Sequence, residues 1–453
     1  MAMLMTGVSG IRGVIGDGLT PDVIARYGAA YGTYIGGGKI VVGSDSRPSR
    51  HMVRSALFAG LMASGCDVID LGLVTTPTIE LMVEKLEASG GICVTASHNP
   101  ISWNAMKFLD NRGRFLGVKA GGEVNGIFNE NQAQLVETSL LGSVYEEKGA
   151  VDYHIQRVLD NNFVDVSAIR RGQFRVAIDA VNSVGNLIMP GLLHDLGCDI
   201  VKAHDDLTGQ FGRGAEPLPE NLSDLSQLVV DEGADIGFAL DPDGDRLAVV
   251  DEQGRPIGEE YTLALAAKYV LEKKPGAVVC NLSTSRVIED LAKSANVDFY
   301  RTPVGEAHVA DKMDEVNAVI GGEGNGGVML PSVHSGRDAM VGAALILSLL
   351  ANEGEPVSII HSRLPGYKMI KRRAIVDNYN FNVLLDALKA FYNNNATFNT
   401  TDGIRIDLDY SWVHVRPSNT EPIVRIYSEA KNKDDANILA EQTIKIIKNV
   451  FKN

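Results

Sequence analysis

One plan of secondary structure occurs three times along the chain and constrains the fold more than any other feature of the sequence. Each copy begins with a β-branched strand and a polar turn, continues with a helical segment, and ends with a second short strand. The copies begin near residues 39, 174 and 277. Strands this continuously apolar, alternating with helices, are typical of sheets that are covered on both faces. The repeat therefore predicts three similar α/β domains.

A further apolar strand follows each copy and leads directly into a polar loop. The loops are Ser-His-Asn-Pro at 97–100, Asp-Pro-Asp-Gly-Asp-Arg at 241–246, and Gly-Gly-Glu-Gly-Asn-Gly-Gly at 321–327. Open α/β sheets bind ligands at the carboxyl ends of their strands. Three such ends turned toward one cleft would form a single composite site.

The chain changes its plan after about residue 367. We expect a helix at 382–388, strands at 403–409, 412–415 and 423–427, and a long helix from about 434. A fourth polar loop, Arg-Pro-Ser-Asn-Thr-Glu-Pro at 416–422, lies between two of these strands. This pattern predicts a smaller α+β domain with one loop of its own.

Composition limits the partners and the compartment. The formal net charge of −15 predicts that the chain as a whole repels nucleic acid and anionic membranes. The longest apolar run, 339–351, is too short to span a bilayer and is better explained as a buried helix. Four scattered cysteines without a Cys-x-x-Cys pair indicate a reducing compartment, so we expect a cytoplasmic protein.

The acidic loop is the strongest chemical signal. Asp241, Asp243 and Asp245 alternate along an extended segment, so their carboxylates can converge, and hard oxygen ligands suit Mg²⁺. An EF-hand is excluded because its sixth position must be glycine, whereas Arg246 stands here, and because residues 247–250 form a strand pattern. An exposed turn rich in Asp, Pro and Gly remains the structural alternative.

The serine loop offers a nucleophile. Ser97 could open a turn before Pro100, or it could carry a phosphoryl group whose charge a metal ion neutralises. His98 beside it could orient the turn or take part in proton transfer, and the sequence does not decide between these roles.

The two remaining loops offer groups that bind anions and sugars. Arg416, with the hydroxyls and the amide that follow it, provides the donors that a phosphate needs, and Arg425 on the next strand could add a second guanidinium. A hairpin connection between two prolines would also explain this loop. In the glycine-rich loop, Glu323 and Asn325 lie two residues apart, so both could reach sugar hydroxyls.

Together the four loops resemble those of the α-D-phosphohexomutase superfamily, in the family's order and over essentially the whole chain. The resemblance implies three similar mixed α/β domains around a central cleft and a smaller α+β C-terminal domain, with ranges 1–150, 151–255, 256–370 and 371–453. It implies a phosphoserine at Ser97, which also ligates the metal ion together with Asp241, Asp243 and Asp245. The opening segment 7–13 adds Arg12, and the segment 103–107 adds Lys107 as the preferred general acid or base. The implied substrate-binding residues are Arg246, Glu323, Asn325, Arg416, Ser418, Asn419, Thr420 and Arg425.

The implied reaction interconverts hexose 6-phosphate and hexose 1-phosphate through a bisphosphorylated sugar, with Mg²⁺ as cofactor and hexose 1,6-bisphosphate as activator. For Lys107 to act as a base its pKa must be lowered, and we expect nearby cations to lower it. The C-terminal domain joins the others through one short connection, so hinge closure over the substrate is expected.

Two departures from the family pattern bear on the substrate. Many bacterial members have Glu-x-Ser-Gly-His in the sugar loop, whereas this chain has Asn325 and Gly327. Residues 302–306 and 336–338 are more similar to archaeal-type members. This resemblance favours a phosphoglucosamine mutase, with a phosphomannomutase/phosphoglucomutase of broad specificity as the alternative, and it leaves the oligomeric state open.

Two rival functions use the same loops. A phosphatase would hydrolyse the phosphoserine and release inorganic phosphate. A non-catalytic sugar-phosphate sensor would have lost Ser97 or an aspartate of the acidic loop, and neither is lost here.

Overall fold

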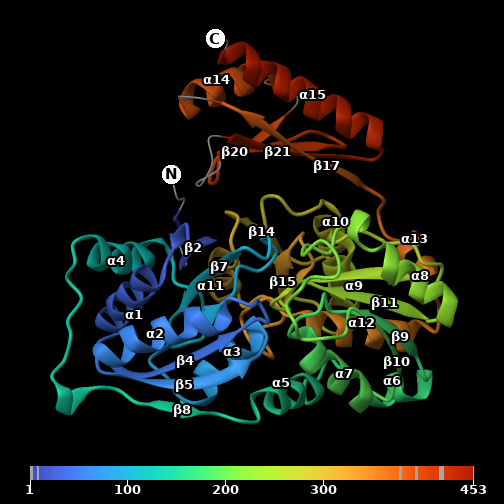
Figure 1. Ribbon diagram of the computed structural model, residues 1–453. Helices are drawn as coiled ribbons and strands as arrows, with labels where there is room; N and C mark the ends of the chain where they lie inside the picture. Colours follow the sequence, from blue (N-terminus) through green and yellow to red (C-terminus); the bar gives the residue numbers. More distant parts are fainter. Residues whose placement is uncertain (1–3, 8–9, 377–379, 393–395, 418–422, 452–453) are drawn as a thin grey trace.

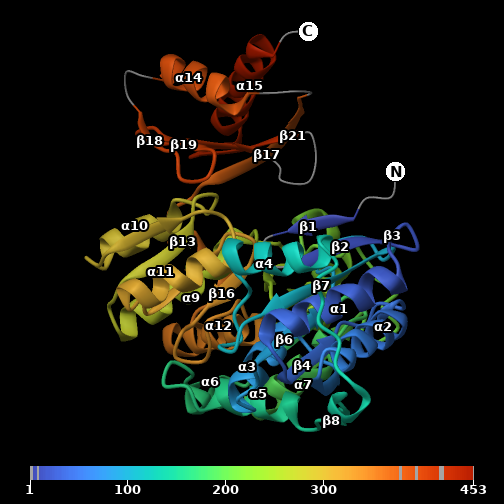
Figure 2. The ribbon, with the colours of Figure 1, turned by 90° about the vertical axis from the view of Figure 1, so that its left-hand side faces the viewer.

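The computed structural model describes residues 4–7, 10–376, 380–392, 396–417 and 423–451. Four sheets follow one another along this part of the chain, each with its own helices (Figure 1). The first three units lie together, and the C-terminal unit, shown in orange and red, lies above them in both views (Figures 1 and 2).

The first sheet has the strand order β1-β2-β7-β6-β4-β5-β8, with β3 paired to β2. Its strands are β1 Met5–Gly7, β2 Gly10–Ile15, β3 Gly18–Leu19, β4 Gly38–Ser44, β5 Cys66–Leu73, β6 Gly90–Val94, β7 Trp103–Leu109 and β8 Val144–Glu146. Its helices are α1 Pro21–Ile35, α2 Arg50–Ala63, α3 Thr76–Lys85 and α4 Val118–Asn129. The strands at the two edges of this sheet, β1–β3 and β8, were not predicted from the sequence repeat.

The second sheet has the order β10-β9-β11-β12. Its elements are α5 Ala150–Leu159, α6 Val166–Gly172, β9 Arg175–Asp179, α7 Gly185–Asp195, β10 Asp199–Ala203, α8 Ser223–Glu232, β11 Ile236–Leu240 and β12 Leu247–Asp251. The third sheet has the order β14-β13-β15-β16. Its elements are α9 Glu260–Lys273, β13 Val278–Asn281, α10 Val287–Ser294, β14 Phe299–Thr302, α11 Glu306–Val316, β15 Ile320–Glu323, β16 Gly327–Met329, α12 Ala339–Glu353 and α13 Val357–Ser362.

The repeat predicted from the sequence is confirmed as a repeat of topology. In each of these sheets the first strand of the copy pairs in parallel with the second and third strands, and a fourth strand returns antiparallel to the third. The polar loops lie where the third strand ends, after β6 and β11 and at the end of β15. The segment after the acidic loop is the strand β12, as the rejection of an EF-hand required.

The apolar run predicted to be a buried helix is α12. It begins at Asp338, whose carboxylate accepts hydrogen bonds from the backbone N–H groups of Met340 and Val341, and it ends at Gly354 in the left-handed conformation. Its side chains lie in one hydrophobic core shared by the second and third units, which includes Phe238 and Leu347. This shared core fixes the acidic loop and the sugar loop relative to each other.

The C-terminal unit has a core of its own. Its sheet has the order β17-β21-β20-β19-β18, with β17 Lys368–Ile375, β18 Thr397–Asn399, β19 Ile404–Asp407, β20 Trp412–Pro417 and β21 Ile423–Ala430. Its helices are α14 Phe381–Tyr392 and α15 Lys433–Val450. These elements confirm the predicted helices and strands of the tail and add β17 and β18. No helix within the described ranges is long and apolar enough to cross a membrane.

Candidate active site

The serine loop holds Ser97 in a strained, buried position. The backbone of Ser97 has φ of 47°, in the left-handed region, and the residue is buried. Its backbone N–H donates to Thr95 Oγ1 over 2.9 Å, and its hydroxyl donates to Asp241 Oδ2 over 2.8 Å. Two loops separated by 144 residues therefore meet at one oxygen of this serine.

A fully buried arginine that the sequence reasoning missed holds this loop in place. Arg47 donates to the carbonyl oxygens of Ser97 (2.5 Å), Asn99 (2.7 Å) and Pro100 (2.7 Å). Its charge is compensated by Asp45, 3.0 Å away. The available signal was the polar Asp-Ser-Arg segment at the carboxyl end of the first repeated strand, which lies beside the serine loop because β4 and β6 are parallel neighbours.

The three aspartates of the acidic loop converge, as their alternation predicted. Asp241, Asp243 and Asp245 are all buried, and one oxygen of each lies within 4.8 Å of the others. Oδ1 of Asp243 and Oδ1 of Asp245 have no hydrogen-bond donor among the described residues. Buried carboxylate oxygens without donors are costly unless a cation binds them, so these residues fit a hard divalent ion.

Cations from other segments occupy the second oxygens of two of these aspartates. Lys107 Nζ lies 2.7 Å from Oδ2 of Asp243, and an Arg337 NH2 group lies 2.5 Å from Oδ2 of Asp245. The guanidinium of Arg246 lies 3.7–3.9 Å from Asp245 and Asp241. One oxygen of Asp243 and one of Asp245 is thus anchored, while the other is left for a ligand.

Burial and mutual repulsion shape the charges of the acidic loop. Burial, with the charges of Asp245 and Asp243, holds the pKa of Asp241 well above its ordinary value. Burial opposes ionisation of Asp243 too, but the charge of Lys107 together with hydrogen bonds involving Asp241, Lys107 and Thr76 outweighs burial and lowers the pKa of Asp243. A bound cation would relieve this repulsion.

The expectation that the pKa of Lys107 is lowered is wrong. Burial does lower it, but the charges of Asp243 and Asp245 outweigh burial and raise the pKa of Lys107 above its ordinary value. The sequence suggested nearby cations as the dominant neighbours, whereas the fold places aspartates there. Lys107 is therefore an ammonium in this state.

His98 and Arg12 lie beside the serine, on the side that faces other cations. His98 Nδ1 is 3.4 Å from Ser97 Oγ, and the charge of Arg246 together with burial holds the pKa of His98 well below its ordinary value. Arg12 donates to Asn99 Oδ1 over 3.4 Å. Partial desolvation and the charges of Arg425 and Arg246 lower the pKa of Arg12. Two guanidinium groups whose charges reach that of a third indicate a place for an anion.

The tail loop is described only in part. Arg416, at the end of β20, lies 3.2 Å from Asp402 and pairs in register with Arg425 on β21. Ser418, Asn419 and Thr420 lie outside the described residues. The tail thus contributes two arginines, and the charge of Arg425 acts on Arg12 of the first unit.

The sugar loop places its carboxylate in a dense set of protein donors. Glu323 is buried, and its Oε1 accepts from Asn281 Nδ2 over 2.6 Å and from the Gly305 backbone N–H over 3.1 Å. Its Oε2 is ion-paired with Arg337. Asn325, in contrast, is partly exposed, with its Oδ1 accepting from the Gly327 backbone N–H over 3.2 Å. Asn325 is thus the more accessible of the two predicted sugar-binding residues.

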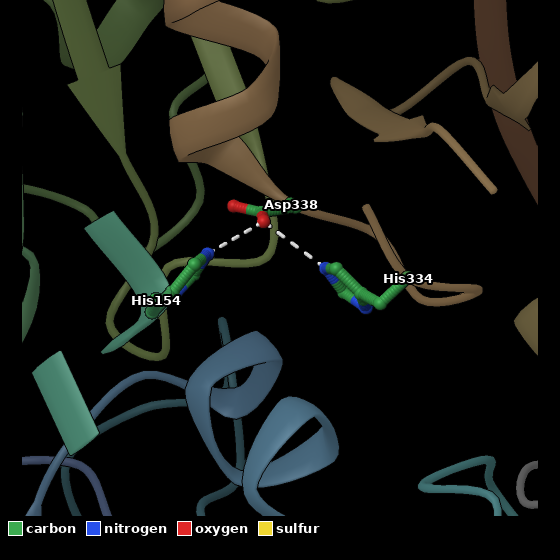
Figure 3. Close-up of side chains that lie close together, drawn as sticks. All are labelled: His154, His334 and Asp338. Atoms are coloured by element: carbon green, nitrogen blue, oxygen red, sulfur yellow. Dashed lines mark hydrogen bonds and ion pairs between the residues drawn. The ribbon is translucent and has the colours of Figure 1, made fainter. Parts of the chain in front are cut away.

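A junction of the three α/β units is centred on Asp338, the residue that follows Arg337 in the sequence (Figure 3). Asp338 Oδ2 is 2.7 Å from His154 Nε2 and 3.0 Å from His334 Nε2. His154 Nδ1 is 2.9 Å from the hydroxyl of Thr78. Helix α3 of the first unit, α5 of the second and the segment before α12 of the third are joined here by side chains that are all buried.

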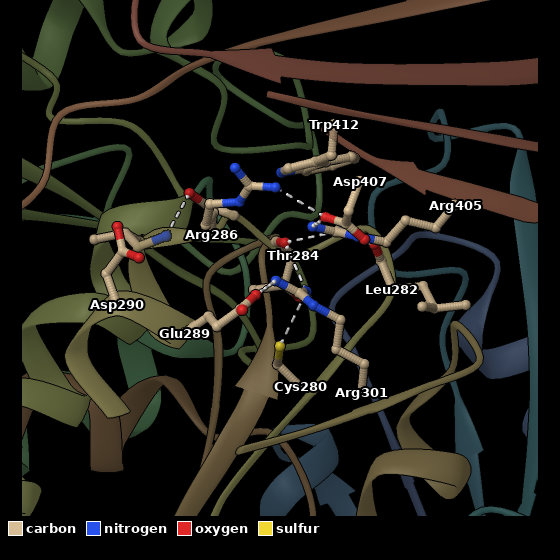
Figure 4. A network of polar contacts seen from close by, with 12 residues as sticks. Cys280, Leu282, Thr284, Arg286, Glu289, Asp290, Arg301, Arg405, Asp407 and Trp412 are labelled. Carbon is tan, nitrogen blue, oxygen red and sulfur yellow. Dashed lines mark hydrogen bonds and ion pairs between the residues drawn. The ribbon is translucent and has the colours of Figure 1, made fainter. Parts of the chain in front are cut away.

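The C-terminal unit is attached to the third unit by a polar network (Figure 4). Arg286 donates to Asp407 Oδ1 (3.1 Å) and to the Leu408 carbonyl (2.9 Å), and Arg405 donates to the Leu282 carbonyl (2.5 Å). Polar contacts between units form and break at a lower cost than a shared apolar core. Hinge closure of the C-terminal unit over the substrate stays a prediction.

The sequence matches known proteins over nearly its whole length. Four family models match, described as the phosphoglucomutase/phosphomannomutase α/β/α domains I (residues 3–135), II (152–254) and III (258–367) and the C-terminal domain (374–446). A "probable phosphoglucosamine mutase" of Methanopyrus kandleri is 36% identical over 448 residues, covering 98% of this chain and 97% of the relative. A "phosphoglucomutase/phosphomannomutase" of Thermococcus kodakarensis is 36% identical over 453 residues, covering 98% of this chain and 99% of the relative.

The fold agrees as well. The crystal structure of a phosphoglucomutase/phosphomannomutase family protein from Burkholderia thailandensis superimposes with a TM-score of 0.86 at 27% identity, covering 98% of this chain and 97% of that one.

Proposed function

Because the chain belongs to the phosphoglucomutase/phosphomannomutase family of phosphohexomutases, we propose that Ser97 carries the phosphoryl group that this enzyme moves between the two ends of a hexose. One observation carries the proposal: the Ser97 hydroxyl points at Asp241 in a buried group of three aspartates, two of which keep an oxygen without a hydrogen-bond donor among the described residues. A phosphorylated serine at this position would face those oxygens, and a cation between them would balance the charge.

The residues proposed to hold this cation are Asp241, Asp243, Asp245 and the phosphorylated Ser97. Oxygen donors favour Mg²⁺, and when bound it would supply positive charge to the phosphoryl group in transfer. The anchored oxygens of Asp243 and Asp245 keep their free partners in fixed positions, so the site is organised by this chain's own cations.

The proposed reaction consists of two phosphoryl transfers. In the first, the P–O bond to Ser97 Oγ breaks, a P–O bond to a free hydroxyl of the hexose phosphate forms, and the hydroxyl proton leaves with an acceptor. The released Ser97 oxygen takes up a proton, and the sugar is then bisphosphorylated and turns over in the cleft. In the second step the P–O bond between the sugar and its other phosphate breaks, Ser97 Oγ loses its proton and forms the new P–O bond, and the released sugar oxygen takes up a proton. Lys107 remains the first candidate for the acid: as an ammonium it can supply the proton that a released oxygen needs. His98, whose lowered pKa keeps it neutral, and Arg12 are the further candidates near the serine for handling the hydroxyl proton.

We propose that a set of guanidinium groups near the serine loop binds the phosphate that does not react. The charges of Arg246 and Arg425 both act on Arg12, and Arg416 pairs in register with Arg425. Ser418, Asn419 and Thr420 keep their predicted role in the same loop. Arginine forks recognise phosphate by paired hydrogen bonds.

For the substrate we favour glucosamine phosphate, with mannose and glucose phosphates as the alternative. The support is the name of the Methanopyrus kandleri relative, against the name of the Thermococcus kodakarensis relative at the same identity. We further propose hexose 1,6-bisphosphate as activator, the four domain ranges given above, and a cytoplasmic location without nucleic-acid or membrane partners.

The proposal is tested by assaying glucosamine, glucose and mannose 1- and 6-phosphates side by side with MgCl₂ and a trace of the matching bisphosphate. Preference for glucosamine phosphate supports the favoured substrate, and equal or better rates on glucose or mannose phosphate support the alternative. Inorganic phosphate is measured in the same samples, because stoichiometric release of phosphate without isomerisation would indicate a phosphatase and contradict the proposal.

A further inference from the structure

Arg337 is a buried arginine that links two of the site's loops. Its three nitrogens face three different carboxylates: NH2 is 2.5 Å from Asp245 Oδ2, Nε is 3.0 Å from Glu306 Oε2, and NH1 is paired with Glu323 Oε2. Asp245 belongs to the acidic loop and Glu323 to the sugar loop. One planar group therefore fixes the distance between the two loops.

The backbone on both sides of Arg337 is fixed as well. Gly336 packs so closely on Glu80 of α3 that a Cβ at Gly336 would lie 1.7 Å from Oε2 of Glu80. Asp338 on the other side is held by His154 and His334 and caps α12 (Figure 3). The guanidinium of Arg337 thus starts from a rigid segment that contacts all three α/β units.

The charge of Arg337 lies in the immediate neighbourhood of the acidic group. It binds Oδ2 of Asp245, while Oδ1 of the same carboxylate has no donor among the described residues. A positive charge at this distance stabilises the ionised aspartate but opposes a second cation at its free oxygen. The same arginine therefore orients the carboxylate and weakens its attraction for a metal ion.

We propose that Arg337 is a positioning residue of the phosphoryl-transfer reaction: it fixes the acidic loop against the sugar loop, and its charge, added to those of Lys107 and Arg246, lowers the affinity of the acidic group for a divalent cation. This inference rests on the proposed function, because it assigns Arg337 an effect on the same aspartates. Within the described part of the chain the ionic partners of the guanidinium are carboxylates, so its effect passes through Asp245 and Glu323.

Two substitutions separate the two effects. Arg337→Gln removes the charge, so we expect the dissociation constant for Mg²⁺ to fall by about tenfold, and kcat to fall by about a hundredfold because the loops lose their common anchor. Arg337→Lys keeps the charge but cannot bridge separate carboxylates with a fork. We expect it to bind Mg²⁺ within about threefold of the wild type, while its kcat falls by about tenfold or more.

The experiment is a calorimetric titration of the full-length chain with MgCl₂ alone, which gives both stoichiometry and affinity, combined with steady-state mutase kinetics. The matched control is Arg363→Gln, because Arg363 is half-exposed and its ion pairs among the described residues are with Glu353 and Glu355, which belong neither to the acidic loop nor to the sugar loop. A merely structural role for Arg337 would lower the number of binding sites per chain and leave their affinity unchanged.

The outcomes are distinct. Tighter Mg²⁺ binding by Arg337→Gln at unchanged stoichiometry, with a reduced kcat in both variants, supports the inference. If the wild type binds Mg²⁺ and isomerises hexose phosphate but both variants behave like Arg363→Gln, the inference is wrong and the proposed function stands. Failure of the wild type in both measurements overturns the proposed function and the inference together. Should Arg337→Gln not fold, wild-type kcat in Arg337→Lys is by itself sufficient to overturn the inference.

Discussion

Replacement of Arg47 by lysine should loosen the serine loop far more than its conservative chemistry implies. Arg47 donates to the carbonyl oxygens of Ser97, Asn99 and Pro100 and pairs with Asp45, all inside the first unit. An ammonium group can keep the ion pair but cannot reach all three carbonyls. Two lost hydrogen bonds at about 1–2 kcal/mol each give a local destabilisation of about 2–4 kcal/mol.

The assay is hydrogen exchange followed by mass spectrometry on the segment 95–103. A local destabilisation of about 2–4 kcal/mol corresponds to exchange that is about 30- to 1,000-fold faster. Arg50→Lys is the matched control, because Arg50 is a neighbouring arginine whose closest hydrogen bond is to the Ser46 carbonyl, at 3.0 Å. The variant Arg47→Met should be worse, since it leaves Asp45 as a buried carboxylate without its partner, at a cost of about 3–5 kcal/mol.

Removing both charges tests the electrostatic part of this reasoning. The double variant Asp45→Asn/Arg47→Met should be less destabilised than Arg47→Met alone, because no unpaired buried charge remains. Exchange in Arg47→Lys that matches both the wild type and Arg50→Lys would refute the assignment of Arg47 as the anchor of the serine loop.

Three further predictions concern pH, the metal and the attachment of the C-terminal unit. A hydrogen bond from His204 to Asp179 outweighs partial burial and raises the pKa of His204, so the stabilisation from this contact is complete below the ordinary pKa of histidine and is lost as the pH rises through the raised pKa of the folded state. Between pH 6 and 9 the melting temperature should therefore fall more steeply for the wild type than for His204→Asn. Equal slopes would contradict this prediction. Added MgCl₂ should raise the melting temperature of the wild type by several degrees at about a hundred times the dissociation constant, and Asp243→Asn should abolish the shift; a shift that survives in the variant would place the metal elsewhere. Arg286→Gln removes a bridge from α10 to the C-terminal unit, so hydrogen exchange in β19 should rise while β11 stays unchanged; a uniform change in both strands would indicate global destabilisation instead.

Sequence reasoning was most successful where a local pattern determines local structure. The alternation of Asp241, Asp243 and Asp245 was enough to predict converging carboxylates, and the repeated strand–helix–strand plan was enough to predict the loops at equivalent strand ends. Both follow from periodicity, which one segment carries by itself.

The contributions of distant charges could not be predicted in this way. Arg47 and Arg337 act on loops that lie far away in the sequence, and no spacing rule connects them to those loops. The pKa of Lys107 was predicted in the wrong direction for the same reason, because its nearest charges come from residues 243 and 245. Glu323 was expected to be open to a ligand, yet Asn281 and Arg337 from other segments surround it.

The most direct test of the central claim follows the phosphoryl group itself. The enzyme is prepared with Ser97 phosphorylated, mixed with one equivalent of hexose 6-phosphate and MgCl₂, and analysed by intact-protein mass spectrometry together with analysis of the sugar products. We predict that Ser97 loses its phosphate as a bisphosphorylated hexose appears, and that Ser97→Ala neither carries the group nor isomerises the sugar. Isomerisation at the wild-type rate by Ser97→Ala, or release of the group as inorganic phosphate only, would contradict the account.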